Sequence, residues 1–443
     1  MLEGYRIEGR RAAEIAASVE RGVADGGLSP GQHLPPLREL AAVLGVNANT
    51  VAAAYRILRE RGVIETAGRR GSRIRSRPVS APREEIGVEA PPGVRDLAKG
   101  NPDPALLPPL APALARAAAR ADRSPPLYGG PPVDEELAAV ARAAFDRDGV
   151  PAGPIAVTSG ALDAIERVLA AHLRPGDAVA VEDPGWAGFL DLIPALGLRP
   201  LPVAVDDEGP LPGPTGHALR AGARALVVTA RAQNPTGAAV SPARAEALRA
   251  VLAAHPGTLL VEDDHGHGVV DLPLLPLSGH TSRWALVRSP AKGYGPDLRM
   301  AVLTGDPVTV DRVQGRQRLG PGWVSHLLQR TLATLWGEGA IDPAEVARSY
   351  AARRDGLIAA LAERGVAALG RSGMNVWVPV PDETGAIARL LHAGWAAAPG
   401  ARFRLDSPPG VRLTVSSLAG ADLAPLADAV AAAVRPPAAR RTD

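Results

Sequence analysis

The sequence predicts an α/β protein in which a small N-terminal winged helix-turn-helix precedes a large sheet with helices on both faces. Three observations lead to this prediction. The 443 residues are too many for one small domain. From about residue 96, short apolar runs alternate with helical segments, which is typical of a mixed, mostly parallel sheet. Before that region, two short helical patterns, a tight turn and a following hairpin indicate a winged helix.

The first 76 residues carry the helix-turn-helix pattern. Helical periodicity is present over residues 8–24, 36–44 and 47–61. Asn47 belongs to a residue type that caps the start of a helix. The stretch "GVIETAGRRGSRIRS" beyond the last helix has the pattern of a hairpin. The apolar stripe expected to face the core consists of Leu40, Ala41, Leu44, Val46, Val51, Tyr55 and Leu58.

Composition and charge exclude some classes of protein. No cysteine is present, which excludes disulfides and thiolate metal sites and fits a reducing cytoplasm. No run of about 18 apolar residues occurs, so we expect no membrane span. Residues 1–76 hold 12 arginines against 8 acidic residues, whereas the remainder is close to neutral. This positive excess suggests a polyanionic partner, although a solvated surface would also account for it.

A linker and a two-part α/β region follow. Residues 77–95 contain Pro, Ser and Gly without periodicity, which predicts a linker. The expected strands of the large sheet are "IAVTSG", "AVAVED", "ALVVTA", "TLLVEDD", "WALVRS" and "AVLTGD", and those of a smaller C-terminal unit are "GMNVWVPV" and "GVRLTVSS". We therefore expect a winged helix over 1–76, a linker over 77–95, a large domain over 96–319 and an α+β subdomain over 320–437.

Lysine is nearly absent from this chain. Of the 49 basic residues only Lys99 and Lys292 are lysines. A primary amine forms an imine with an aldehyde, and a guanidinium does not do so at neutral pH, so Lys292 is a candidate for covalent attachment of an aldehyde cofactor. Ser289 and Arg299 flank it and suit a phosphate on that cofactor. Chance survival of a surface lysine is the alternative, as Lys99 illustrates.

Other segments supply what such a cofactor needs. Asp263 ends a buried strand, where a carboxylate can pair with a pyridinium nitrogen. Asn234, in "QNPTG", could donate to a phenolic oxygen, and Trp186 could stack on a flat ring. "TSGA" leads from a strand into a helix, where backbone N–H groups favour a phosphate. A cap, a turn, a core position or a metal site at "DDHGH" would explain these residues one at a time, but their order along one α/β chain favours the cofactor.

The order of these motifs resembles that of fold-type I, class I/II aminotransferases. The motifs that carry the resemblance follow one another in the order typical of that family, and they are "TSGA", "EDPGW", "NPTG", "VEDD", "SPAK" and a late "VRLTV". With the N-terminal "LPPLRELAAVLGVNANTVAAAY", the chain resembles the MocR subgroup of GntR-type bacterial transcription regulators. Members fuse a winged helix to an aminotransferase-like domain that binds pyridoxal 5'-phosphate. The resemblance spans roughly residues 10–435.

The resemblance implies a role for each matching position of the cofactor site. Lys292 would hold pyridoxal 5'-phosphate as an internal aldimine, Asp263 would face the pyridine nitrogen, and Asn234 would contact the ring oxygen. Trp186 would stack on the ring. The residues implied around the phosphate are Ser159, Gly160, Ala161, Ser289 and Arg299.

Two further positions follow from the same resemblance. The sites of this fold lie at a homodimer interface, so Tyr128 would reach the phosphate of the partner subunit. Arg412 would grip the carboxylate of a substrate or effector with two hydrogen bonds.

In the winged helix, the residues that occupy DNA-facing positions of relatives are Arg38, Asn47, Asn49, Thr50 and Tyr55. Arg69, Arg70 and Arg73 would enter or flank the minor groove from the wing. A solvated hairpin tip is the alternative for the wing arginines, and a core position is the alternative for Tyr55.

The chain departs from the family pattern at several positions. His265 stands where a tyrosine commonly supports the ring oxygen. An imidazole can donate there too, but its charge depends on pH. The other departures are Leu162 for a frequent glutamine, Ala291 for a small hydroxyl residue, and Ala48 for an arginine of the recognition helix.

We therefore expect a transcription regulator that binds operator DNA and senses pyridoxal 5'-phosphate or an amino compound. The alternative is an active aminotransferase with an accessory DNA-binding domain, built from the same residues. The first 76 residues favour the regulator, because a metabolic aminotransferase has no use for them. A response to pyridoxal 5'-phosphate itself, controlling vitamin B6 genes, is a further form of the regulator hypothesis.

Overall fold

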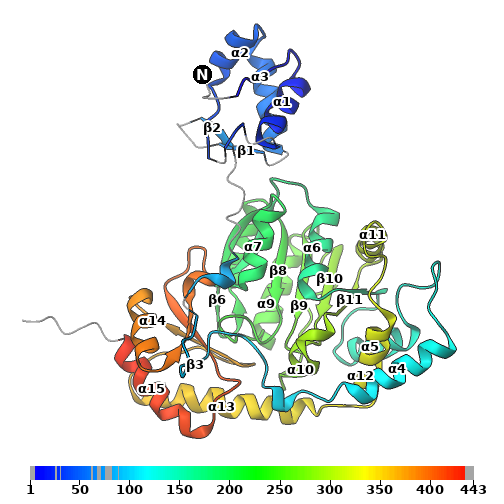
Figure 1. Ribbon diagram of the computed structural model, residues 1–443, viewed down its shortest axis with the longest axis vertical. Helices are drawn as coiled ribbons and strands as arrows, with labels where there is room; N and C mark the ends of the chain where they lie inside the picture. The colour runs from blue at the N-terminus through cyan, green and yellow to red at the C-terminus, as the bar shows by residue number, and fades with distance from the viewer. Residues whose placement is uncertain are drawn as a thin grey trace, which may run out of the picture. The chain divides into compact units, whose positions relative to one another are not determined.

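The computed structural model forms two compact units, one made mainly by the first 82 residues and one by most of the chain from Arg83 onward (Figure 1). The residues that the structure describes are 5–24, 27–29, 31–60, 63–66, 71–74, 82–87 and 89–434.

The N-terminal unit is a winged helix. Its elements are α1 (Ala12–Ala24), α2 (Leu37–Leu44), α3 (Ala48–Glu60), β1 (Ile64–Thr66) and β2 (Ser72–Ile74). The two strands pair antiparallel, and Ile64 lies opposite Ile74. α1 packs against α3, and the side chains of Ile15, Val51 and Leu58 between them are fully buried.

The turn between α2 and α3 follows from its residues. Gly45 ends α2 in the left-handed conformation at φ 64°, which costs a glycine little. The Asn47 Oδ1 atom accepts from the Asn49 backbone N–H at 2.8 Å, which satisfies a free donor at the start of α3. The helix-turn-helix and hairpin predicted from the sequence are therefore present.

The large domain is built on an eight-stranded sheet. Its strand order is β4-β11-β10-β9-β8-β5-β6-β7. The strands are β4 (Ile155–Thr158), β5 (Ala178–Asp183), β6 (Arg199–Asp206), β7 (Gly209–Pro210), β8 (Ala223–Thr229), β9 (Leu259–Asp264), β10 (Arg283–Arg288) and β11 (Ala301–Gly305). β8, β9 and β10 run parallel, whereas β11 is antiparallel to β10 and β4.

All six apolar runs predicted as strands of this sheet are strands, whereas β6 and β7 were not predicted. β9 is buried on both faces along its whole length, which explains its continuous apolar run. β6 is half-exposed and contains two prolines, so its pattern is weak.

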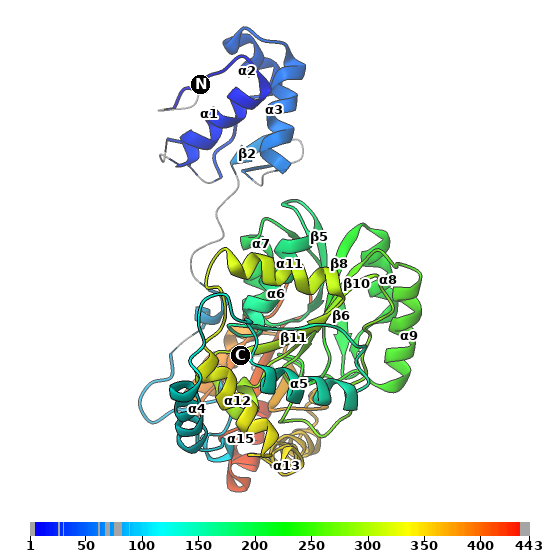
Figure 2. The ribbon, with the colours of Figure 1, turned by 90° about the vertical axis from the view of Figure 1, so that its right-hand side faces the viewer.

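Helices cover both faces of the sheet. Figure 2 shows α8 and α9 on one side and α6 and α11 on the other. The helices of this domain are α4 (Ala111–Arg123), α5 (Glu135–Arg147), α6 (Ala161–His172), α7 (Ala187–Ala195), α8 (Pro212–Arg220), α9 (Pro242–Ala253), α10 (Ala291–Tyr294), α11 (Pro307–Arg318) and α12 (His326–Gly337), with the short η3 (Pro104–Leu106) and η4 (Pro296–Leu298). Leu248 and Leu252 of α9 pack with Leu226 and Leu260 of the sheet in one core.

The C-terminal subdomain has a small antiparallel sheet with the order β12-β15-β14. Its elements are α13 (Pro343–Glu363), β12 (Asn375–Pro379), α14 (Glu383–His392), β13 (Trp395–Ala396), β14 (Ala398–Pro399), η5 (Gly400–Arg402), β15 (Gly410–Thr414) and α15 (Gly420–Val434). β13 pairs in parallel with β3 (Arg95–Asp96). Leu357 and Leu361 of α13 belong to the core of this subdomain.

The packing moves two of the expected boundaries. Leu332 and Leu335 of α12 lie in the core of the large domain, so the C-terminal subdomain begins at α13 rather than at residue 320. The expected linker also ran too far, because η2 (Arg83–Glu85) and β3 both attach to the C-terminal subdomain. Neither contact has a local sequence signal.

Candidate functional site

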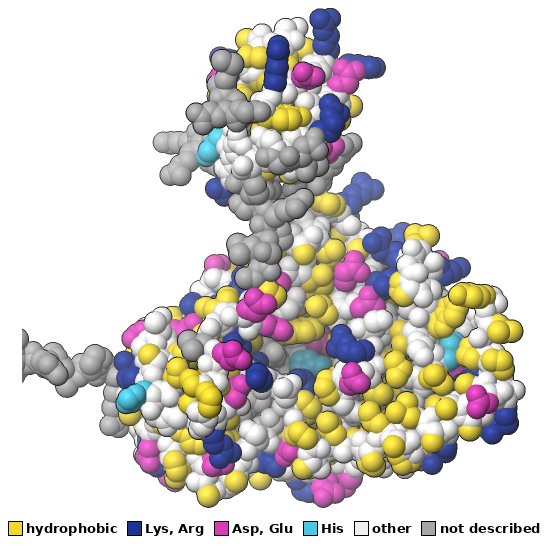
Figure 3. Space-filling model, in the orientation of Figure 1, with side chains coloured by type: hydrophobic (Ala, Val, Ile, Leu, Met, Phe, Trp, Pro, Cys, Tyr) yellow, Lys and Arg dark blue, Asp and Glu magenta, His cyan; other side chains and the backbone are white. Residues whose placement is uncertain are grey.

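A cavity of about 380 Å³ lies beyond the carboxyl ends of the parallel strands. Parallel strands bring their carboxyl ends to one edge, so side chains from distant parts of the chain meet there. Figure 3 shows the hollow on this face of the larger unit, with histidine and basic side chains visible in it. The predicted site residues that line it are Gly160, Ala161, Trp186, Asn234, Asp263, His265, Ser289, Lys292 and Arg299.

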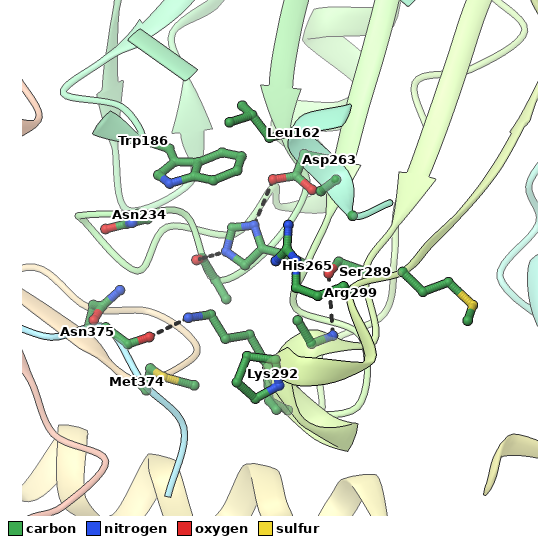
Figure 4. Close-up of a pocket in the computed structure, with 18 of the residues that line it drawn as sticks. Leu162, Trp186, Asn234, Asp263, His265, Ser289, Lys292, Arg299, Met374 and Asn375 are labelled. Atoms are coloured by element: carbon green, nitrogen blue, oxygen red, sulfur yellow. Dashed lines mark hydrogen bonds and ion pairs between the residues drawn. The ribbon is translucent and has the colours of Figure 1, made fainter. Parts of the chain in front are cut away.

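Lys292 lies in α10, directly after β10, and its side chain extends into the cavity (Figure 4). Its Nζ atom donates to the Gly100 carbonyl. Burial and the nearby Arg412 guanidinium lower the pKa of Lys292 to about 8, against the weaker attraction of Glu84 and Asp263. A substantial fraction of the amine is therefore neutral near pH 8 and available as a nucleophile.

Asp263 and Asp264 are adjacent in β9 but point to opposite faces. Asp264 accepts from Arg231 and Arg288, each at 2.8 Å, and these two guanidinium groups overcome burial and hold its pKa below the usual range. Asp263 faces the cavity and has one buried oxygen, Oδ1, that finds no hydrogen-bond partner among the residues the structure describes. A buried free acceptor is costly unless a donor reaches it, so this atom fits the protonated nitrogen of a pyridine ring.

His265 lies where its imidazole bridges two acceptors. Its Nδ1 is 2.8 Å from the Asp263 Oδ2 atom, and its Nε2 is 2.7 Å from the Ala232 carbonyl. Burial disfavours the charged ring, but the Asp263 carboxylate and the Ala232 carbonyl raise its pKa. Both nitrogens are engaged, so His265 has no N–H left for a ring oxygen. The role expected from the family tyrosine is therefore replaced by a contact to Asp263.

Arg412, in β15, is buried and has no carboxylate partner among the described residues. One Nη donates to Asn234 Oδ1 at 3.0 Å, the other donates to the Ala98 carbonyl, and Nε has no partner within the described part of the chain. Burial, followed by the charge of Arg402, lowers the pKa of Arg412 to about 10. A carboxylate entering here would gain a partner that is already desolvated. Because Asn234 Oδ1 is occupied, the amide nitrogen is left to donate.

The expected phosphate residues surround the start of α6. Gly160 has φ +102°, and the Arg299 Nη2 atom donates to the Ser159 carbonyl at 3.3 Å. Ser289 is buried at the end of β10, and its Oγ accepts from the Ala291 N–H at 3.4 Å. The Ser159 N–H already donates to Asp163 at 2.9 Å, so it is not free as the sequence suggested.

The indole of Trp186 enters the cavity from the side opposite Lys292 (Figure 4). Tyr128 lies elsewhere: it is 93% exposed, and its ring packs edge-on against Trp323 with centroids 5.4 Å apart. The structure thus brings Trp186 to the cofactor residues of its own chain, but it does not bring Tyr128 there.

Several residues of the cavity had no sequence signal, among them the following four. Glu84, Gly100, Met374 and Asn375 line the same cavity. Glu84 and Gly100 lie at the start of the larger unit, and the other two come from the C-terminal subdomain, so only tertiary packing brings them to the strand ends.

In the winged helix, Arg38 and Asn49 are exposed and Thr50 is half-buried. Asn47 is exposed and uses its side-chain oxygen as the α3 cap. Arg73 is exposed and pairs with Glu65 at 2.6 Å. Arg69 and Arg70 lie outside the described residues.

Tyr55 is a core residue rather than a DNA contact. Its side chain is 2% exposed, and its hydroxyl donates to the Pro35 carbonyl at 2.8 Å. Burial raises the pKa of this hydroxyl further above its usual range. Of the two positions considered for Tyr55, the structure has the core position rather than the DNA-facing one, because the apolar stripe of α3 takes the ring inward.

Within the described ranges, no group of three or more His, Asp or Glu side chains is arranged to hold a metal ion. No single helix of the described structure has the length and hydropathy to cross a bilayer, although the bent pair Leu37–Leu44 and Ala48–Arg59 passes on length and composition when taken together.

Comparison with known proteins gives matches to two families. Residues 92–430 match the aminotransferase class I and II family, and residues 11–74 match the gntR family of bacterial regulatory proteins. The vitamin B6 salvage pathway transcriptional repressor PtsJ of Salmonella typhimurium is 40% identical over 427 residues, which cover 95% of this chain and 98% of that protein. The pyridoxine biosynthesis regulator PdxR of Corynebacterium glutamicum is 31% identical over 275 residues, 60% of this chain and 59% of that protein.

Solved structures resemble the larger unit. The α-aminoadipate aminotransferase LysN of Thermus thermophilus superposes with a TM-score of 0.69 at 23% identity, over 80% of this chain and 96% of its own. A Thermus thermophilus aspartate aminotransferase tetra mutant gives 0.68 at 25% identity, over 79% and 99%. At this level of identity the likeness concerns the fold.

Proposed function

This chain belongs to the MocR subgroup of GntR-type transcription regulators, and from that premise we propose that its larger unit binds pyridoxal 5'-phosphate and controls DNA binding by the winged helix. The cofactor would be attached covalently through Lys292. The ligand sensed would be the cofactor itself or an amino compound that competes with Lys292 for it.

One observation carries the proposal. A lysine with a lowered pKa and a buried carboxylate with a free oxygen line the same cavity, as the aldehyde and the pyridine nitrogen of this cofactor require. When bound, the cofactor supplies an aldehyde that condenses reversibly with primary amines. Lys292 would present the amine, and Asp263 would keep the ring nitrogen protonated.

The remaining residues of the site would bind the cofactor and the amino compound and orient them. The Asn234 amide would donate to the ring oxygen, and Trp186 would cover one ring face. The phosphate would be held by Gly160, Ala161, Ser289, Arg299 and Ser159, the last through its hydroxyl because its N–H is taken by Asp163. Arg412 would bind the carboxylate of an amino compound, because its guanidinium is desolvated and without an anionic partner among the described residues.

We further propose that the working form is a homodimer. Tyr128 is 93% exposed and does not line the cofactor cavity of its own chain, and in a dimer it would reach the phosphate of the partner subunit. A dimer would also present two winged helices to two half-sites of an operator. The DNA contacts proposed on each are Arg38, Asn47, Asn49, Thr50 and the wing arginines.

A segment just after the linker offers a route from the cavity to the DNA-binding unit. Arg83 donates to the carbonyls of Ala401 and Arg404 at 3.2 and 3.0 Å, and Arg402 donates to the Ile86 carbonyl at 2.5 Å. We call residues 83–87 with their contacts to 399–404 the clasp. Glu84 of the clasp lines the same cavity as Lys292.

An anionic ligand in the cavity would compete with Glu84 for the surrounding positive charge, and would thereby favour release of the clasp. Release would change the tether of the winged helix. Such a ligand alters DNA affinity only if it binds the clasped and released forms unequally.

The genes under control would include those of vitamin B6 metabolism. PtsJ and PdxR carry vitamin B6 salvage and pyridoxine biosynthesis in their names. A regulator that holds the vitamin's active form is suited to report its supply.

The second candidate function is aminotransferase catalysis. It is favoured by the cofactor residues themselves and by the fold shared with solved aminotransferases. Steady-state turnover with amino and keto acid pairs at ordinary enzyme rates would support it and count against a purely regulatory role.

The decisive experiment measures fluorescence anisotropy of the full-length protein on the intergenic DNA upstream of its own gene, with and without pyridoxal 5'-phosphate. We expect specific binding whose affinity changes at least about fivefold with the cofactor, in the range typical of allosteric coupling. An unrelated duplex of the same length controls for nonspecific binding. No specific binding in either state would contradict the proposal.

A further inference from the structure

His265 is bonded in a way that requires two protons on its ring. Its partners are a carboxylate oxygen of Asp263 and the carbonyl oxygen of Ala232, at 2.8 and 2.7 Å. Both partners can only accept, whereas a neutral imidazole has one donor and one acceptor nitrogen. The ring therefore makes both hydrogen bonds only as an imidazolium.

The carbonyl that His265 holds belongs to a strained residue. Ala232 has φ 57°, a left-handed conformation that an alanine rarely adopts. The Ser372 Oγ atom accepts from its N–H at 2.9 Å, and a Cβ on Gly373 would come within 2.6 Å of the Ala232 side chain. Strain of this kind persists only where surrounding contacts over-determine it. His265 is one of these contacts.

The two partners of His265 lead to opposite ends of the proposed cofactor. Asp263 would face the ring nitrogen, and Ala232 lies two residues before Asn234, which would face the ring oxygen. Because His265 binds only Oδ2 of Asp263, the Oδ1 atom stays free for the ring nitrogen. The imidazole therefore fixes both the carboxylate and the turn that carries the amide (Figure 4).

We propose that His265 is a positioning residue. As an imidazolium it joins Asp263 to the 231–234 turn, so the protonation state of this one ring determines the geometry of the cofactor site. This inference rests on the proposed cofactor. It differs from the role of the family tyrosine, which contacts the ring oxygen directly, because His265 does not reach the ring through either nitrogen.

Charged groups on two elements act on this imidazole. Asp263 of β9 favours the imidazolium, and Lys292 of α10 opposes it, as burial does. Burial is the largest single influence, but the charge and hydrogen bond of Asp263 together with the Ala232 carbonyl outweigh burial and Lys292, so the pKa of His265 is raised. When the pH rises through that raised pKa the ring becomes neutral, and either Asp263 or Ala232 loses its donor. We expect cofactor affinity to fall in that range.

The test compares the variants His265→Gln and His265→Phe with His392→Gln. The last is the matched control, because His392 is an exposed histidine on α14. Pyridoxal 5'-phosphate is titrated into each protein across pH, and its absorbance is followed. Removing a charged hydrogen bond predicts an affinity at least about tenfold weaker in both variants, and a smaller loss in the glutamine variant, which keeps one donor. The fall in affinity expected for wild type as the pH rises through the raised pKa of His265 should be absent from both.

Two outcomes overturn the inference. The first is an affinity and pH profile for the two variants that match those of His392→Gln. The second is a predominantly neutral His265 in the cofactor-free protein at pH 6.5, the usual midpoint of a histidine, read from nitrogen-15 shifts of histidine-labelled protein with His265→Gln used for assignment. The second measurement needs no cofactor. It therefore decides the charge state even if the wild type fails to bind pyridoxal 5'-phosphate. Such a failure would contradict the proposed function and not this inference. Equal melting temperatures of cofactor-free variants show that folding is not the cause.

Discussion

The Arg299 guanidinium packs closely against Gly160, because a Cβ built on that glycine would come within 2.9 Å of the Arg299 Nη2 atom. Gly160 also has φ +102°, where any side chain is strained. The proposed phosphate site therefore depends on a residue without a side chain.

Gly160→Ala should weaken pyridoxal 5'-phosphate binding about tenfold or more, because the arginine must move away from the phosphate. Gly222→Ala is the matched control, since Gly222 has φ +97° and no atom within 4 Å of the added Cβ. Both variants should lose about 1 kcal/mol or more of unfolding free energy from backbone strain. Equal cofactor affinities in titrations of the two variants would show that Arg299 plays no part in binding.

Lys292→Arg should abolish covalent attachment while the positive charge is kept. Borohydride reduction followed by mass spectrometry should place one cofactor on wild type and on Lys99→Arg, but none on Lys292→Arg. Lys99 is the natural control, because it is exposed and pairs with Asp96 at 3.2 Å. Attachment that persists in Lys292→Arg would show that Lys292 is not the residue to which the cofactor is attached.

The rate of attachment should depend on pH with a midpoint near 8. The neutral amine is the nucleophile, and the pKa of Lys292 is lowered to about 8. Below that pH the rate should fall about tenfold per unit, and above it the rate should level off. Stopped-flow absorbance at constant ionic strength measures this profile. A midpoint near the usual 10.5 of a lysine would mean that the amine is solvated.

Arg83→Ala should uncouple the cavity from the DNA-binding unit, because it removes two hydrogen bonds of the clasp. We expect cofactor affinity to stay within about twofold of wild type, while the change of DNA affinity on cofactor addition shrinks to less than half. Arg348→Ala, an exposed arginine on α13, is the control. Anisotropy with and without cofactor gives both numbers. An unchanged response in Arg83→Ala would rule out the clasp as the route.

Arg38→Ala should weaken operator binding about tenfold, since Arg38 is exposed on α2 and is one of the DNA contacts proposed above. Arg21→Ala, at the end of α1, should change affinity by less than about twofold. A salt titration of both separates a phosphate contact, which lowers the salt slope by about one, from a base contact, which does not. Equal operator affinities of the two variants would show that the DNA-binding face of the winged helix does not include Arg38.

Much of this architecture could be predicted because its signals are local. The periodicity of α2 and α3, the Asn47 cap and the continuous apolar runs of β5 and β9 are properties of neighbouring residues. Lysine scarcity singled out Lys292, and strand-end acids singled out Asp263, since the carboxyl ends of parallel strands must meet at one edge. The half-exposed, proline-containing β6 escaped prediction because its pattern is diluted.

By itself the sequence determined which elements form, in what order, and which side chains could carry the chemistry of an aldehyde cofactor. Only the tertiary structure decided how those side chains are paired. It turned His265 onto Asp263 and the Ala232 carbonyl, buried Tyr55 in the core, and attached residues 83–87 to 399–404. The physical reason is that periodicity and capping depend on residues a few positions apart. A hydrogen-bond partner is chosen by which distant segments the packed cores bring within about 3 Å.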